Sequence, residues 1–410
     1  MAKRWNRAET WLTAIVLGVA LLLAGIAGLW MYMSATSAPL HPSAQGVPAV
    51  LDAAPPAEWT EAIDRARQIV RAHLTEHNLP GLSVAVGVGG DIAWAEGFGW
   101  ADLERRVPVA PNHRFRIGTA STVLTSAAAG LLLQDGRLKL DEEIQTYVPE
   151  FPKKPWPVTL RQLMGHLAGV RSDGGDEGPL LGERCERPVD GLRVFADREL
   201  LFEPGTQFRY SRYGWIVVSA AVEAAAGEPF LTFMREKIFD PLGMQDTRAE
   251  SATKPIPDRA TVYFPRFAAD PRYGPDVMRD IDLSCYAGAG IFLSTPSDLV
   301  RFGIAVTSGK LLQPATVQLL QTSQRLRSGE ETGYGLGWDL ETVTLLGEPA
   351  RAVGHDGDVL GGMVASLMTV PQRGIVAAVT SNISYADTFG LASKIVEPFA
   401  EQMNRTTDRR

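Results

Sequence analysis

A chain of 410 residues with 45% hydrophobic and 21% charged residues has enough apolar material for one large globular domain or two medium ones. Its formal net charge of -7 is spread along the chain, which argues against a nucleic-acid partner, because such proteins carry a clustered basic face. The chain has two cysteines, too few for a zinc site of their own, and we expect neither a metal nor another cofactor.

Residues 11–33 contain no charged side chain and are long enough to cross a bilayer as a helix, which takes about 20 residues. Lys3, Arg4 and Arg7 precede them, and the next basic side chain of Lys or Arg type is Arg65. This asymmetry predicts a cytoplasmic segment over residues 1–10, a transmembrane anchor over 11–33 and an extracytoplasmic, periplasmic remainder. A cleaved signal peptide is the alternative, although signal cores usually span only about 7–15 residues.

Residues 34–58 follow the apolar segment and carry five prolines. This composition predicts an extended, semi-rigid linker. The globular body is then expected over residues 59–410.

The body is expected to begin and end with paired strands and a helix. Amphipathic periodicity predicts a helix over 59–78, and Gly89-Gly90-Asp91 predicts a hairpin between two strands. Between the two ends, residues 141–239 are predicted to be mostly helical with long loops. The other predicted elements are strands 83–88, 92–98, 362–370 and 374–381, and helices 119–133 and 386–403.

Strands at both chain ends with helices between them favour an α+β fold. We expect one antiparallel sheet built from both ends of the chain, flanked by helices, with an inserted helical region over about 120–300. A site would lie in the crevice between the sheet and the inserted helices.

Residues 115–122 read Phe-Arg-Ile-Gly-Thr-Ala-Ser-Thr and precede an apolar run. They resemble the start of the active-site helix in the serine β-lactamase and penicillin-binding protein family, where Phe-Arg-Ile-Gly leads into Ser-x-x-Lys. In that family the Ser is acylated, and the Lys one helical turn later helps to deprotonate it. Here Thr119 stands at the Ser position and Thr122 at the Lys position.

Further stretches carry the same resemblance, which extends from about residue 59 to residue 401. Their order is similar to the class C-like enzymes, and most similar to the branch of the mitochondrial β-lactamase-like protein. The stretches are residues 80–86, 97–103, 160–169, 202–211, 240–244 and 288–295.

The resemblance implies a site assembled from three distant segments. Tyr210 matches the Tyr of the family's Tyr-x-Asn motif, and His355 opens a match to its His-x-Gly strand. Thr119, Thr122, Tyr210 and His355 are therefore the candidate catalytic residues. The backbone N–H groups of Thr119 and Asp358 would stabilise the oxyanion. A simpler alternative for Thr119 is that it only caps the helix.

Arg212, Asp356, Gly357 and Asp358 are the candidate substrate-binding residues. Gly357 would let a substrate backbone approach the strand. The two aspartates would repel a ligand carboxylate by on the order of 1 kcal/mol per close contact. We expect Arg212 to pair with one of them.

Two functions remain open from the sequence. One is a membrane-anchored enzyme that transfers or hydrolyses acyl groups of peptide-like amides or esters, with an altered nucleophile and base. The other is a non-catalytic protein that uses the same cleft to bind a small molecule or peptide, as a scaffold or sensor. Homo-oligomerisation and a disulfide between Cys185 and Cys285 are also left open.

Overall fold

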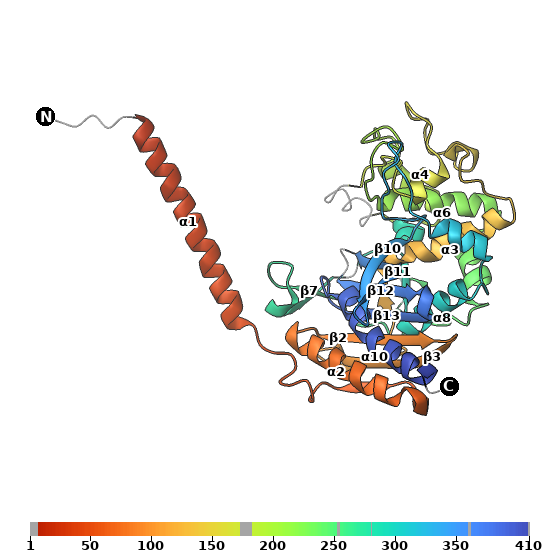
Figure 1. The fold of residues 1–410 in the computed structure, drawn as a ribbon. Coiled ribbons are helices and arrows are strands. Elements are labelled where there is room, and N and C mark those ends of the chain that lie inside the picture. Colours follow the sequence, from red (N-terminus) through yellow and green to blue (C-terminus); the bar gives the residue numbers. More distant parts are fainter. Residues whose placement is uncertain (1–6, 173–182, 252–254, 280, 360–361, 409–410) are drawn as a thin grey trace.

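The computed structural model describes residues 7–172, 183–251, 255–279, 281–359 and 362–408. A long helix, α1 (Arg7–Thr36), stands apart from a globular body, and both are visible in Figure 1. Residues 11–36 of this helix form a span apolar enough to cross a membrane, and none of the most apolar 18-residue window is buried against the body. A signal sequence close to the N-terminus has the same properties.

The body is built on one eight-stranded antiparallel sheet with the strand order β1-β3-β2-β13-β12-β11-β10, and β4 added to β3. The strands come from both ends of the chain, and β2 from the N-terminal part pairs with β13 from the C-terminal part. Their bounds are β1 (Ala49–Leu51), β2 (Gly81–Val88), β3 (Asp91–Asp102), β4 (Val107–Pro108), β10 (Asp339–Leu345), β11 (Glu348–Val359), β12 (Met363–Val370) and β13 (Ile375–Ser381).

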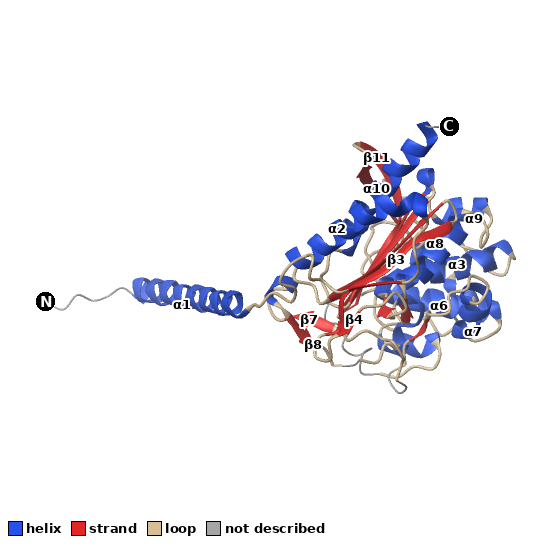
Figure 2. Ribbon diagram, turned by 90° about the horizontal axis from the view of Figure 1, so that it is seen from below, coloured by secondary structure: helices blue, strands red, loops and turns tan. Residues whose placement is uncertain are grey.

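Helices cover both faces of this sheet, so its central strands are apolar on both sides. In β2, Val84 and Val86 pack into the core under α2 (Thr60–Glu76) and α10 (Thr388–Asp408). Ala85, between them, points into the opposite core, because successive side chains of a strand face opposite ways. Figure 2 shows α2 and α10 on one side of the sheet and the inserted helices on the other.

The inserted region supplies the second layer. The helices α6, α7 and α9 pack on α3, which is buried along nearly its whole length, and α8 packs on the sheet. Short 3-10 turns and small strand pairs connect them. The helices are α3 (Ser121–Gln134), α4 (Leu160–Met164), α6 (Arg212–Ala226), α7 (Phe230–Met234), the π-turn η5 (Arg235–Phe239), α8 (Pro296–Thr307) and α9 (Pro314–Leu320). The 3-10 turns are η1 (Ala57–Trp59), η2 (Gly118–Ala120), η3 (Ile144–Thr146), η4 (Pro188–Val194), η6 (Pro271–Tyr273), η7 (Ser284–Ala289) and η8 (Pro371–Arg373). The small strands are β5 (Phe115–Arg116), β6 (Arg248–Ala249), β7 (Tyr263–Pro265), β8 (Pro275–Val277) and β9 (Phe292–Ser294).

The predicted α+β architecture is confirmed, with the sheet formed by both chain ends and the helical region inserted between them. The predicted linker needs a correction. Within residues 34–58, Ala49–Leu51 forms the edge strand β1 against β3, and His41 and Val47 are buried. The prolines keep the segment extended, and an extended chain can add to an exposed sheet edge without rearrangement.

A buried ion pair fixes the segment that leads into α3. Arg116 of β5 contacts Glu250 at 2.7 Å, and both side chains are almost completely enclosed. Arg259 contacts the same carboxylate at 2.6 Å. Buried charges of this kind are stable only while every partner is present.

Replacing one partner of this pair should destabilise the fold strongly. We expect Glu250→Gln to lower the free energy of unfolding by about 3–5 kcal/mol, because it removes the buried carboxylate charge that Arg116 and Arg259 both contact. Urea unfolding measures this loss. As a control, Glu331→Gln removes the exposed partner of Arg325 and should cost about 0–1 kcal/mol. Equal losses in the two variants would contradict this role of the pair.

Candidate active site

The two altered motif positions lie at the start of α3. Thr119 sits in η2, and Thr122 follows one turn later, with its hydroxyl donating to the Thr119 carbonyl at 2.8 Å. Both residues are buried. The simpler alternative, that Thr119 caps the helix, is wrong, since α3 begins after Ala120 without a side-chain cap. The Thr119 hydroxyl instead donates to the Asp356 carbonyl at 3.1 Å.

Strand β11 passes directly against this helix start. A Cβ atom at Gly357 would lie 1.9 Å from the Ile117 carbonyl oxygen and 2.7 Å from the Ala120 nitrogen. Only a glycine permits that approach without a backbone shift. The contact brings Thr119 and the strand that carries Asp358 side by side.

Tyr210 and His355 meet at the same place. The Tyr210 hydroxyl lies 3.5 Å from His355 Nε2, and the nearby Thr119 side chain acts on the pKa of this phenol. A second phenol, that of Tyr334, lies 3.0 Å from His355 Nε2, and the nearby Thr122 side chain acts on its pKa. Thr119, Thr122, Tyr210 and His355 therefore converge, and Tyr334 joins them.

His166 is buried beneath these side chains. Its ring stacks beside Tyr210, with centroids 4.1 Å apart, and beside Tyr334 at 4.7 Å. Its Nδ1 accepts a hydrogen bond from the Ser211 backbone N–H at 3.0 Å, which positions the residue before α6. His166 also holds a positive φ of 59°.

The aromatic groups of the cleft are held in their uncharged forms. Burial raises the pKa of Tyr210 and of Tyr334, in each case well above the usual value near 10. Burial likewise lowers the pKa of His166 far below the usual imidazole value, and the charge of His355 adds to that shift. At neutral pH the two phenols stay protonated and His166 stays neutral.

Arg212 begins α6, after the N-cap Ser211, whose side chain accepts from the Gly214 N–H. Burial lowers the pKa of Arg212, while nearby Tyr286 and Asp358 counteract that shift. In turn, burial raises the pKa of Asp358 to about 6, and the positive charge of Arg212 opposes the increase. The Asp358 carboxylate accepts from the Ser384 hydroxyl at 3.5 Å and from the Tyr385 N–H at 3.3 Å. A direct pair between Arg212 and Asp358 stays a prediction.

Asp356 lies on the other face of the sheet, which corrects the expectation of two carboxylates beside the cleft. His355 and Gly357 face the inserted helices, so Asp356 between them faces α10. Burial raises its pKa to about 6, and Ser366 and Asp339 also act on it. Only its carbonyl reaches the cleft, as the acceptor for Thr119.

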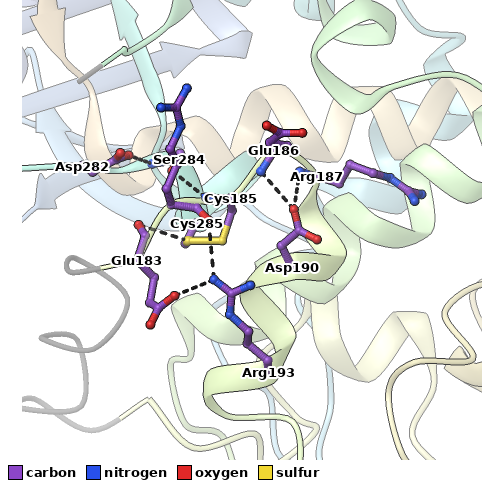
Figure 3. The surroundings of a disulfide bond; sticks show 10 residues. Glu183, Cys185, Glu186, Arg187, Asp190, Arg193, Asp282, Ser284 and Cys285 are labelled. Carbon is purple, nitrogen blue, oxygen red and sulfur yellow. Dashed lines mark hydrogen bonds and ion pairs between the residues drawn. A yellow bond between two sulfur atoms is a disulfide. The ribbon is translucent and has the colours of Figure 1, made fainter. Parts of the chain in front are cut away.

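A disulfide ties the cleft wall to the inserted region. Cys185 and Cys285 are joined, which resolves the pairing that the sequence left open. Figure 3 shows Cys185 beside Ser284, with its N–H donating to the Ser284 hydroxyl at 3.0 Å, and Arg193 reaching Glu183. The bond thereby fixes η7, which supplies Tyr286 next to Arg212.

The sequence did not identify Tyr334 or His166 as members of the cleft. Tyr334 lies in a Gly-Tyr-Gly-Leu-Gly-Trp stretch whose glycines indicate a loop but no chemistry. His166 lies within residues 160–169, one of the stretches that carry the family resemblance, so the sequence did offer a motif that could have identified it.

Residues 66–396 match the family described as Beta-lactamase. This match covers most of the chain. The chain belongs to the β-lactamase family. The serine β-lactamase-like protein LACTB, mitochondrial, of Mus musculus is 28% identical, over 84% of this chain and 82% of that protein. Penicillin-binding protein 4* of Bacillus subtilis is 26% identical, over 67% of this chain and 62% of that protein.

Solved structures share the β-lactamase family fold with this chain. The octameric penicillin-binding protein homologue from Pyrococcus abyssi has a TM-score of 0.68 at 23% identity, covering 82% of this chain and 76% of that one. The D-amino acid amidase from Ochrobactrum anthropi, complexed with L-phenylalanine amide, has a TM-score of 0.68 at 23% identity. The match covers 86% of this chain and 100% of that one. At these identities the likeness concerns the fold alone.

A side chain at position 357 should disrupt the cleft. We expect Gly357→Ala to lower the free energy of unfolding by about 1–3 kcal/mol or more, because its Cβ would overlap the Ile117 carbonyl. Urea unfolding measures the change. Gly214→Ala is the matched control, since the nearest atom to its Cβ lies at 3.6 Å. A Gly357→Ala protein as stable as that control would contradict the proposed close packing.

Proposed function

We propose that this protein is a membrane-anchored, extracytoplasmic member of the β-lactamase family that binds a peptide-like amide or ester in its cleft without turning it over. One observation carries the proposal. The positions of the family's nucleophile and lysine hold two threonine hydroxyls, and that of Thr122 donates to the Thr119 carbonyl at 2.8 Å.

Acyl transfer needs a base that removes the proton of the nucleophile. The hydroxyl of Thr122 cannot accept a proton at neutral pH as an amine does. The raised pKa of Tyr210 keeps that phenol protonated, so it is a poor substitute for the missing base. Both arguments support a cleft in which Thr119 remains protonated.

Ligand binding depends on groups that these replacements leave intact. We assign the backbone N–H groups of Thr119 and Asp358 to the carbonyl oxygen of the ligand, as oxyanion donors of the family. Arg212 completes the contact surface, whereas the Cβ side of Gly357 faces Ile117 and Ala120 rather than a ligand. The D-amino acid amidase and the penicillin-binding proteins among the relatives support an amide or peptide as the ligand class.

Membrane attachment is assigned to α1. Its apolar span over residues 11–36 and the basic residues before it support a cytoplasmic segment 1–10 and an exported body. A cleaved signal is the alternative for the same helix. The octameric homologue from Pyrococcus abyssi supports homo-oligomerisation as a further property.

Residual acyl transfer is the second candidate function. In this candidate the proton leaving Thr119 passes to His355 through the Tyr210 hydroxyl, which lies near the Thr119 side chain and 3.5 Å from His355 Nε2. Threonine hydroxyls act as nucleophiles where a base is adjacent. This candidate requires His355 to act as the base.

Restoring the family's pair should create activity. We expect the wild-type protein to hydrolyse nitrocefin and p-nitrophenyl acetate at background rates, and Thr119→Ala to leave those rates unchanged. The double variant Thr119→Ser/Thr122→Lys should exceed background, since general-base activation contributes about 10²–10⁴-fold in rate. Initial rates from absorbance measure this.

Two controls accompany the assay. Thr119→Ser alone lacks the lysine and should stay near background. Wild-type turnover that is lost in Thr119→Ala would overturn the non-catalytic proposal in favour of the second candidate. A folded double variant without activity would contradict the view that only this pair is missing.

A further inference from the structure

A two-stranded hairpin projects from the body towards the end of α1. It consists of β7 and β8, with Tyr263 paired to Val277 at its root and Pro265 paired to Pro275 near its tip. Residues 266–274 connect the strands and contain η6. Figure 1 shows the hairpin standing between the sheet and the lower end of α1.

Two hydrogen bonds join this hairpin loop to α1. The indole N–H of Trp30 donates to the Tyr273 hydroxyl at 2.9 Å. The guanidinium of Arg266 donates to the Thr36 hydroxyl at 3.1 Å. Since a helix rises about 1.5 Å per residue, these contacts hold the loop along roughly 9 Å of the end of α1.

The number of residues along α1 indicates where these contacts would lie relative to a bilayer. The apolar span runs over 26 residues from Trp11 to Thr36, whereas about 20 residues cross the hydrocarbon core. Counted from Trp11, the twentieth residue is Trp30. Tryptophan and tyrosine concentrate at the membrane–water boundary, and Trp30 and Tyr32 lie at this end. Tyr273 is therefore held at the level of the outer headgroups.

The exposed side chains of residues 266–274 are compatible with the outer headgroup region of a membrane. Ala268 and Ala269 are exposed at its tip and both adopt positive φ, 56° and 53°. This conformation costs free energy for a residue with a Cβ atom. Contact with water does not offset that cost for two alanines, whereas contact of their methyl groups with lipid would. Phe267 packs edge-on against Tyr273, with centroids 5.3 Å apart.

The hairpin also carries exposed apolar and charged side chains, with Arg272 in the loop and Asp276 on β8. Arg272 is exposed and paired with Asp270 at 2.6 Å, so the carboxylate is not left facing anionic headgroups. Val277 is 67% exposed. Aromatic, aliphatic and arginine side chains together are typical of a segment that rests in a membrane interface.

We propose that hairpin β7–β8 and residues 266–274 rest on the outer phospholipid surface as a second membrane contact beside α1. This rests on the anchoring role of α1 proposed above. The contact would fix the orientation of the cleft, because the hairpin root packs on Gly362, the residue before β12. A Cβ at Gly362 would lie 2.4 Å from a Val262 methyl and 2.6 Å from the Tyr263 carbonyl.

The test uses the full chain reconstituted in vesicles of phosphatidylcholine and phosphatidylglycerol. Ala268→Cys is labelled with the fluorophore NBD, and a nitroxide on the lipid headgroup serves as quencher. The native cysteines are joined in the disulfide, so the label attaches at one place. The matched control is Leu231→Cys, exposed on α7, which lies at the end of the body away from α1 (Figure 2).

We expect the label at position 268 to lose fluorescence to the headgroup nitroxide and the label at 231 to keep it. Val277→Cys provides a second position with the same expected loss, should the loop variant fail to fold. Flotation after alkaline carbonate treatment tests the anchor separately. A protein that floats but shows equal quenching at 268, 277 and 231 would overturn the hairpin contact. A protein that does not float would overturn the anchor itself.

Discussion

The cleft depends on one close backbone approach, that of β11 to the start of α3. Ile117 and Gly357 are separated by most of the body's sequence, yet no side chain fits between their backbones. The approach brings the sheet, built from both chain ends, against the inserted helices. It also sets the Thr119 hydroxyl on the Asp356 carbonyl. Every other group of the cleft takes its place relative to this contact.

The backbone frame of the cleft and its side chains support different steps of the proposed function. The frame keeps what the β-lactamase family needs to hold a carbonyl group, namely a helix start beside a strand edge. Its side chains include the uncharged phenols of Tyr210 and Tyr334, and the Tyr334 hydroxyl lies 3.0 Å from His355 Nε2. Neutral groups avoid the free-energy cost of burying an unpaired ammonium. Binding and turnover are thereby separated in this proposal.

Much of the fold follows from local patterns. The helix ending before Pro80 and the hairpin at Gly89-Gly90 are read from periodicity and turn residues, and α2, β2 and β3 lie within a few residues of the predictions. Strand β1 was missed because its partner is distant in sequence and its own three residues carry little pattern. The disulfide was undecided because sequence gives no distance between Cys185 and Cys285.

The residues of the candidate site that belong to sequence motifs could be predicted, whereas those brought there only by tertiary packing could not. Thr119, Tyr210 and His355 were located through motifs, whereas Tyr334 enters from a glycine-rich loop. The position of Asp356 was expected wrongly, although strand alternation assigns it to the face opposite His355 and Gly357. The protonation states of Tyr210 and His166 arise from burial, which no sequence pattern reports.

The central claim is that Thr119 is held in an acyl-binding frame without a base to activate it. The most direct measurement is the intact mass of the protein after incubation with benzylpenicillin. We predict an unchanged mass for the wild-type chain and a penicilloyl adduct on residue 119 in Thr119→Ser/Thr122→Lys. A stoichiometric adduct on Thr119 of the wild-type protein would contradict the account.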